Sequence, residues 1–264
     1  MYGVHLKQSL GQNFLHDKNV ARKIVSRIKV SGDDTVVEIG PGDGAITGLL
    51  AEKSGCVVAV EIDKRFADTV REKYSSFSNL VVRCEDFLKT ELRELYERYG
   101  ILTIVGNLPY HITSSILFKM FDNRDFVNST YIMVQREVGE RILSGPYSKS
   151  RGILSVLSQY YCKVHSLFSV SKNVFIPKPK VDSLFISLEF YRKPQPDVMD
   201  EVLFRKVVKQ TFGKRRKYLK NSLKELADID LESLEGKFDL KRRPEELTVD
   251  EFVELTNAIY KMLS

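Results

Sequence analysis

The sequence predicts an α/β domain with a mostly parallel sheet, followed by a small all-helical domain. In the first part of the chain, short apolar stretches alternate with stretches of helical periodicity, as in a parallel sheet covered on both faces. The last two apolar stretches follow one another closely, which indicates an antiparallel pair at one edge. Beyond residue 198 the apolar residues recur only at three- and four-residue spacing, which predicts helices alone.

The elements follow in order from these patterns. A helix begins after Asp17 because Val20, Ile24 and Ile28 share one face, with Asp17 as the capping residue. Continuous runs of β-branched and apolar residues predict buried strands, and amphipathic runs predict helices. The expected strands are 35–39, 57–60, 80–83, 101–105, 131–134, 163–168 and 184–190, and the expected helices include 46–50, 64–73, 90–99, 114–121 and 137–143.

A linker divides the two expected domains. Residues 191–198 (YRKPQPDV) contain Pro194 and Pro196 between an apolar stretch and the helical region. We therefore expect a domain over residues 1–192 and a helical domain over residues 193–264.

Composition excludes several classes of protein. The chain has 264 residues, 43% of them hydrophobic and 29% charged, which is a globular composition. No apolar run is long enough for a transmembrane helix, and the first residues do not resemble a secretory signal. The three cysteines form no CxxC pair and the four histidines form no ligand pair, so we expect no disulfide framework, no metal site and a cytoplasmic location.

The positive charge is concentrated in one segment. The net charge is +6, yet residues 203–224 contain nine Lys and Arg and no acid, leaving 32 basic and 35 acidic residues elsewhere. Exposed helices normally mix both signs, so an acid-free segment favours a polyanion partner over an ordinary solvated face. The expected RNA-binding residues are Lys214, Arg215, Arg216, Lys217 and Lys220.

Three features follow successive strands and together predict an adenosine-containing cofactor. EIGPGDG places Gly40 and Gly42 at a strand-to-helix turn, where a ligand can approach the backbone. The spacing is GxGxG, which differs from the dinucleotide-binding GxGxxG. Glu61 ends the next strand, where a carboxylate can accept both ribose hydroxyls, and Asp86 follows the third strand, where it can hold an adenine amine. Each feature alone is compatible with an ordinary turn.

The segment Asn107-Leu108-Pro109-Tyr110 follows the fourth strand and suits chemistry on a nucleobase amine. Such an amine is a weak nucleophile, because its lone pair is delocalised into the ring. The side-chain oxygen of Asn107 and the main-chain carbonyl of Leu108 can accept its two N–H groups. Pro109 stiffens the turn and Tyr110 can stack on the base. The alternative is an Asn-x-Pro turn that only precedes a helix.

The motifs, in order, resemble those of the rRNA adenine dimethyltransferase family. They are QSLGQNFL (8–15), EIGPGDGAIT, Glu61, Asp86, GNLPY and FIPKPKVDS (175–183), and MVQREVGERI, GKRRKYLKNSL and RPEELTVDEF extend the match nearly end to end. The chain is most similar to the bacterial small-subunit (16S) group, which dimethylates two adjacent adenosines. NLPY is shared with other amino-methylating enzymes, so the terminal segments carry the family assignment.

The resemblance implies a Rossmann-like methyltransferase domain that uses S-adenosylmethionine. Asn13 and Leu15 would close over the cofactor and Gly40 would contact its amino-acid end. Asn107 would lie between cofactor and target, and Phe175 would sandwich the flipped adenine with Tyr110. The implied partner is small-subunit rRNA in an assembling small ribosomal subunit, bound by a monomer without membrane involvement.

Two departures from the family pattern affect expected RNA contacts only. Arg151 stands before Gly152 where many relatives have an aromatic residue, and Gln8 replaces a usual cation. Three alternatives remain open: a large-subunit (23S) rRNA methyltransferase of the macrolide-resistance type, a non-catalytic ribosome-assembly or transcription factor, and, least favoured, an NAD-dependent oxidoreductase.

Overall fold

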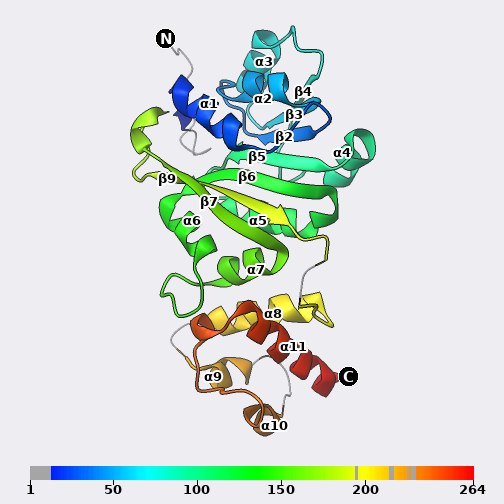
Figure 1. Ribbon diagram of the computed structural model, residues 1–264, viewed down its shortest axis with the longest axis vertical. Helices are drawn as coiled ribbons and strands as arrows, with labels where there is room; N and C mark the ends of the chain where they lie inside the picture. Colours follow the sequence, from blue (N-terminus) through cyan, green and yellow to red (C-terminus); the bar gives the residue numbers. More distant parts are fainter. Residues whose placement is uncertain (1–12, 194–195, 214–216, 225, 227–229) are drawn as a thin grey trace. The chain divides into compact units, whose positions relative to one another are not determined.

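A computed structural model describes residues 13–193, 196–213, 217–224, 226 and 230–264 (Figure 1). The chain forms two compact units. The first comprises the chain up to Gly139 together with His165–Phe190, and the second comprises Glu140–Val164 together with Tyr191–Ser264. The grouping of residues 140–164 with the helical region differs from the two continuous ranges expected from the sequence. The assignment of RNA binding to residues 193–264 stays a proposal.

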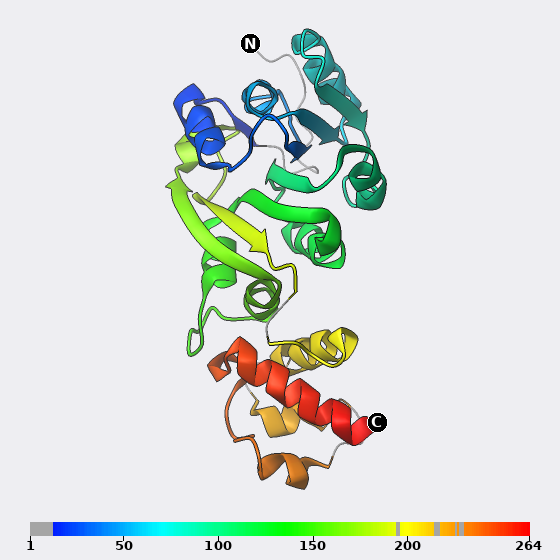
Figure 2. The same ribbon diagram turned by 45° about the vertical axis from the view of Figure 1, so that its right-hand side comes forward.

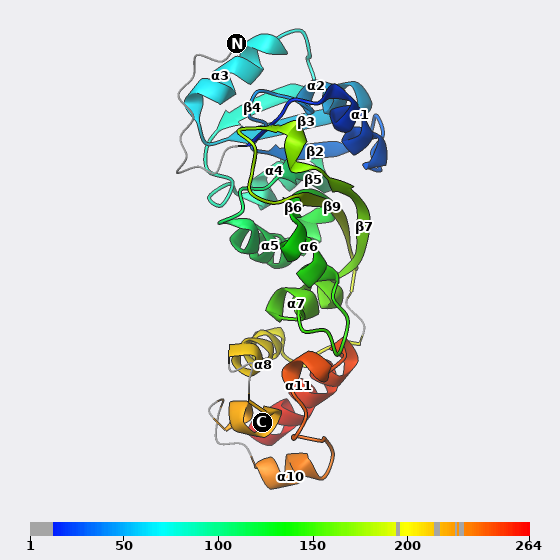
Figure 3. The same cartoon turned by 90° about the vertical axis from the view of Figure 1, so that its left-hand side faces the viewer.

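The first unit is built on a seven-stranded sheet in the order β4-β3-β2-β5-β6-β9-β7 (Figure 3). Parallel pairing joins β4 to β3, β3 to β2, β2 to β5 and β5 to β6, and β9 runs antiparallel to β6. The strands are β2 (Thr35–Ile39), β3 (Cys56–Glu61), β4 (Leu80–Cys84), β5 (Leu102–Asn107), β6 (Val127–Gln135), β7 (Cys162–Val170) and β9 (Ser183–Phe190). The predicted α/β class is therefore confirmed, with the two late strands at one edge.

The central strands are buried along their length because both faces of the sheet are covered. Every residue of β2 is buried, and the β-branched side chains of β2 and β3 pack well on a pleated surface. The helices of this region are α1 (Lys18–Arg27), α2 (Thr47–Lys53), α3 (Lys64–Lys73), α4 (Leu92–Tyr99), α5 (Thr113–Asp122) and α6 (Arg136–Leu143). Asp17 caps α1 by accepting from the main-chain N–H groups of Asn19 and Val20, as the sequence predicts.

Two very short strands form a second, two-stranded sheet. β1 (Phe14–Leu15) pairs antiparallel with β8 (Phe175–Ile176), and Leu15 is opposite Phe175. This pairing joins segments separated by about 160 positions in the chain. The pairing fixes Phe14 and Leu15, near the start of the described chain, beside Phe175 and Ile176.

The second unit is helical, with α8 (Glu201–Gly213), α9 (Leu219–Leu223), α10 (Leu231–Glu235) and α11 (Val249–Leu263) after the linker. α11 lies against α8 (Figure 2), and the rings of Phe212 and Phe252 stack at 5.9 Å between centroids. A capping box at Thr248 and Glu251 begins α11.

One helix of this unit, α7 (Ile153–Tyr161), has no counterpart among the elements expected from the sequence. Leu154–Ser158, Tyr160 and Tyr161 are all buried, so α7 is covered nearly all round. A helix of this kind lacks the apolar stripe that predicts amphipathic helices.

Candidate active site

A cavity of about 330 Å³ opens where the carboxyl ends of β2, β3 and β5 meet. The register brings these ends together, because Ile39 is opposite both Val60 and Gly106. The volume is within the usual range of small-molecule sites, roughly 300–1,000 Å³. All the cofactor contacts predicted from sequence line it: Asn13, Leu15, Gly40, Gly42, Glu61, Asp86 and Asn107.

The glycine turn has a backbone conformation that disfavours side chains, and at Gly42 it also leaves no space for one. Gly40 and Gly42 have φ of +62° and +58°, a left-handed backbone that favours glycine. A Cβ at Gly42 would lie 2.7 Å from the ring of Phe14, which packs over the turn. The backbone and one aromatic ring therefore form this wall of the cavity.

Glu61 is buried and held at both carboxylate oxygens. Oε2 accepts from the Gly42 N–H at 3.1 Å and Oε1 accepts from the Asp63 N–H at 2.9 Å. Burial raises the pKa of Glu61, these backbone hydrogen bonds lower it, and the nearby charge of Asp63 raises it. The carboxylate is oriented toward the cavity and still has lone pairs to accept a ligand's hydroxyls.

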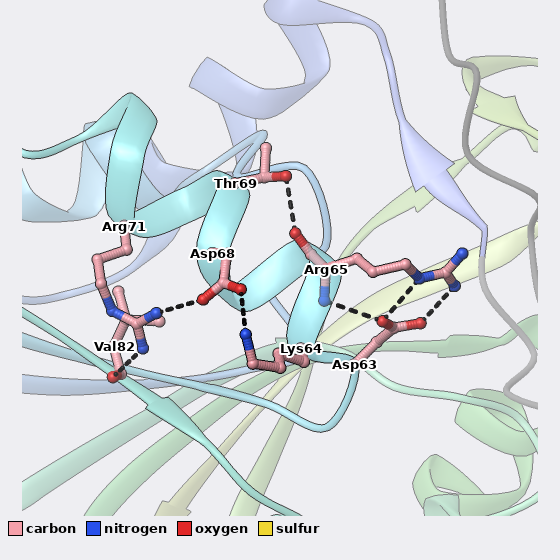
Figure 4. A network of polar contacts seen from close by, with 7 residues as sticks. All are labelled: Asp63, Lys64, Arg65, Asp68, Thr69, Arg71 and Val82. Carbon is pink, nitrogen blue, oxygen red and sulfur yellow. Dashed lines mark hydrogen bonds and ion pairs between the residues drawn. The ribbon is translucent and has the colours of Figure 1, made fainter.

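Asp63 lies at the start of α3 (Figure 4). Its main-chain N–H is the donor to Glu61. Its Oδ1 accepts from the main-chain N–H of Arg65, which caps the helix. The guanidinium of Arg65 binds the same carboxylate through two nitrogens, with Nε 3.0 Å from Oδ1 and Nη2 2.6 Å from Oδ2. This bidentate pair places a cation beside the carboxylate that neighbours Glu61.

A further acid, Glu38, lines the cavity although it is absent from the predicted site residues. Burial, reinforced by Glu61 and Asp43, raises the pKa of Glu38 to about 8. Its Oε2 has no hydrogen-bond partner among the described residues. The signal in the sequence was an acid within a fully buried strand, since such a residue is rarely buried without a partner or a role.

Asp86 follows β4 and lies at the cavity wall, as expected from its position after the third predicted strand. Its Oδ1 accepts from the Leu88 N–H at 2.9 Å, which closes a tight turn after the strand. Asp86 lines the cavity together with Glu38 and Glu61. A ligand with positive charge would favour the ionised forms of these groups, because a nearby opposite charge lowers the pKa of a carboxyl.

Asn107 ends β5 with a fixed side chain. Its amide nitrogen donates to the main-chain carbonyl of Asn13 at 3.0 Å, which turns the amide oxygen away from that contact. Leu108 is buried and its N–H donates to the carbonyl of Met133 at 3.0 Å. The carbonyl of Pro109 accepts from the Ile112 N–H and from the hydroxyl of Thr113 at the start of α5. Asn107, Leu108 and Pro109 all line the cavity.

The two aromatic residues predicted to hold a base lie beside the cavity lining and are not part of it. Tyr110 is half-buried, with its hydroxyl 3.4 Å from Oγ of Ser183. Phe175 is only 3% exposed and packs in the core cluster that also contains Leu15. Their role in stacking on a base stays a prediction.

The acid-free segment contributes exposed cations from α8 and from the residues that flank α9. Lys206, Lys209, Lys217 and Lys224 are exposed. Two other members have partners within the second unit: Nζ of Lys220 is 2.7 Å from the Glu235 carboxylate, and Nε of Arg205 donates to the hydroxyl of Tyr161. Lys214, Arg215 and Arg216 lie outside the described residues.

A family model described as "Ribosomal RNA adenine dimethylase" matches residues 3–261. The chain belongs to this family. A "Ribosomal RNA small subunit methyltransferase A" of Clostridium botulinum is 40% identical over 99% of this chain and 97% of its own length. A protein of the same name from Bacillus mycoides is 40% identical over 98% of this chain and 92% of its own length. The family predicted from the motifs is thereby confirmed.

Two solved structures share the fold. A dimethyladenosine transferase from Plasmodium falciparum superposes with a TM-score of 0.82 at 23% identity, over 94% of this chain and 98% of its own. The 23S rRNA methyltransferase ErmE superposes with a TM-score of 0.74 at 24% identity, over 94% of this chain and all of its own. The predicted Rossmann-like methyltransferase fold is confirmed. No helix in the described part of the chain is long and apolar enough to cross a membrane.

Proposed function

We propose that the protein transfers methyl groups from S-adenosylmethionine to the exocyclic amines of two adjacent adenosines near the 3′ end of small-subunit rRNA, giving dimethyladenosines. One observation carries the proposal: Glu61, Asp86 and Asn107, from three strand ends, line one cavity with the glycine turn. Family membership and the two relatives named small-subunit methyltransferases support the choice of substrate.

The residues of the cavity fit the cofactor. The turn at Gly40 and Gly42 presents backbone without side chains to the cavity, and Glu38 has a buried oxygen without a partner among the described residues. A ligand with an ammonium and a sulfonium group fits this lining, because its positive charge would favour the ionised forms of Glu38, Glu61 and Asp86. When bound, the cofactor supplies the methyl group on a sulfonium, which is already a good leaving group.

The protein's own residues orient the reactants and accept hydrogen bonds from them. Glu61 would accept the ribose hydroxyls, and Asp86 the adenine amine of the cofactor. The amide oxygen of Asn107 and the carbonyl of Leu108 would accept the two N–H groups of the target amine and hold its nitrogen toward the methyl group. The Asn13 carbonyl maintains the orientation of the Asn107 amide. Leu108 and Met133 are buried and provide apolar lining at this end of the cavity.

RNA binding would use the exposed lysines of α8 and of the segment before α9. Lys206, Lys209 and Lys217 are within reach of solvent and belong to a segment without acids. On single-stranded nucleic acid, each phosphate contact makes the slope of log affinity against log salt concentration more negative by about 0.7. Lys217→Glu should therefore weaken RNA binding and flatten this slope, whereas Lys237→Glu, an exposed lysine outside the segment, should change neither property as much.

The test is transfer of labelled methyl groups to unmethylated small subunits and, separately, to naked large-subunit rRNA, with the modified nucleoside identified. We expect dimethyladenosine in small-subunit rRNA only. Labelling of large-subunit rRNA instead would favour the macrolide-resistance type of enzyme, and no labelling of either RNA would favour an assembly factor. Asn107→Ala should reduce transfer about 10²–10³-fold while RNA binding is retained.

A further inference from the structure

Arg151 is buried in the second unit beside α7, where it has no exposed surface. One terminal nitrogen, Nη1, donates to the carbonyl of Ser144 at 2.8 Å and to the side-chain oxygen of Gln159 at 3.1 Å. Ser144 directly follows α6, so this half of the guanidinium is bound at a helix C-terminus, where a cation is favoured.

The other half of the guanidinium has no such partner. Nε and Nη2 are buried and make no hydrogen bond with any residue that the structure describes. These two nitrogens form a side of arginine that can hold a carboxylate or a phosphate group in two parallel hydrogen bonds. Arg65 uses the same two nitrogens to hold the carboxylate of Asp63 (Figure 4).

A buried arginine in this state destabilises the folded protein. A guanidinium keeps its charge in proteins, and a buried charge needs both a counter-charge and acceptors for its N–H groups. Burial lowers the pKa of Arg151, and no carboxylate contributes to that pKa. The carbonyl of Ser144 and the amide of Gln159 supply dipoles only.

We propose that the Nε–Nη2 side of Arg151 binds a phosphate group. An oxyanion supplies both the missing charge and two acceptors in the geometry that this side of arginine matches. The choice of phosphate over carboxylate rests on the proposed RNA substrate. The phosphate comes either from the RNA backbone or from free inorganic phosphate.

A phosphate could reach the buried Nε–Nη2 side only if nearby chain moved, and the turn over residues 144–150 directly precedes Arg151. At its centre Tyr147 has φ of +63°, a conformation that is strained for a bulky residue, and its side chain is 74% exposed. Its N–H donates to the carbonyl of Glu245 at 2.8 Å, which holds the turn in this position. In the proposed binding step, movement of this turn would break the Tyr147–Glu245 hydrogen bond, relieve the positive φ at Tyr147 and expose the guanidinium.

The first experiment measures thermal unfolding of the whole chain, without RNA or cofactor, in inorganic phosphate and in chloride at equal ionic strength. The variants are Arg151→Lys, which keeps a cation but loses the paired nitrogens, and Arg151→Met, which keeps an unbranched apolar stem. We expect phosphate to raise the unfolding temperature of the wild type by several degrees and to leave both variants unchanged. In chloride, Arg151→Met should be at least as stable as the wild type, because it removes a buried charge.

An equal response to phosphate in the wild type and both variants would overturn the proposal, and so would the absence of any response in the wild type. Substrate RNA affinity identifies the source of the phosphate. If it is the RNA backbone, Arg151→Lys weakens RNA binding roughly tenfold. If it is free phosphate, RNA affinity is unchanged although the thermal response is lost. Methyl transfer plays no part in the thermal measurement, so failure of the proposed activity would be seen separately.

Discussion

Replacement of Glu38 by glutamine should make the protein more stable at neutral and alkaline pH. The carboxyl is 2% exposed, and burial raises its pKa to about 8 from an ordinary 4.5. The folded protein therefore retains a proton on Glu38 between pH 4.5 and 8 that the unfolded chain has released. Stability from this group is complete below pH 4.5 and is lost as the pH rises through 8.

The pKa gives the size of the effect. A pKa of about 8 against 4.5 corresponds to a cost of roughly 5 kcal/mol for ionised Glu38 above pH 8, with relaxation of the site reducing the measured value. Glutamine has nearly the same volume and no charge to desolvate. The stability advantage of Glu38→Gln should therefore be small at pH 5 and should reach a few kcal/mol at pH 8.5.

The assay is urea unfolding of the wild type and of Glu38→Gln at intervals between pH 5 and 9, without cofactor. Glu97→Gln, at an exposed carboxylate on α4, is the matched control and should follow the wild type at every pH. A constant difference between Glu38→Gln and the wild type across this range would refute the reasoning, because it would show that Glu38 does not change its charge there.

Two further predictions concern the walls of the site. Gly42→Ala should weaken cofactor binding at least tenfold and cost about 1–3 kcal/mol of stability, since the new Cβ meets Phe14 and the backbone φ is positive; calorimetric titration and urea unfolding would show this. Gly32→Ala, where a Cβ has nothing within 4 Å, should match the wild type in both measurements. Phe175→Leu should reduce methyl transfer roughly tenfold, with little change in cofactor affinity, if Phe175 stacks on the target base. Phe175→Ala should in addition cost about 3–5 kcal/mol of stability, because the ring is buried in the core cluster with Leu15. Normal turnover of Phe175→Leu would assign the ring to the core alone.

Local sequence was sufficient to predict the strands of the seven-stranded sheet and the residues that meet in the cavity at the ends of those strands. The range predicted for α3 matches the structure, and the strand at 35–39 is β2. Both follow from periodicity and capping, which depend on near neighbours in the chain. Glu61, Asp86 and Asn107 could be grouped because parallel strands place their carboxyl ends at one edge.

Features that depend on distant contacts were not accessible in this way. α7 is buried nearly all round, so its sequence has no distinct apolar face. The pairing of β1 with β8 joins segments from opposite ends of the first unit. The sequence also could not show that residues 140–164 group with the C-terminal helices, because compactness depends on contacts in space.

The sequence by itself determined the α/β class, the family and the set of polar residues at the strand ends, because each depends on residue type and spacing. Only the tertiary structure decided their physical state. It buries Glu38 without a full set of partners, binds the Asn107 amide to the Asn13 carbonyl and leaves one side of Arg151 without an acceptor among the described residues. Burial and hydrogen-bond partners arise from segments far apart in the chain, and they decide which of these groups carries a charge or an open hydrogen-bonding site.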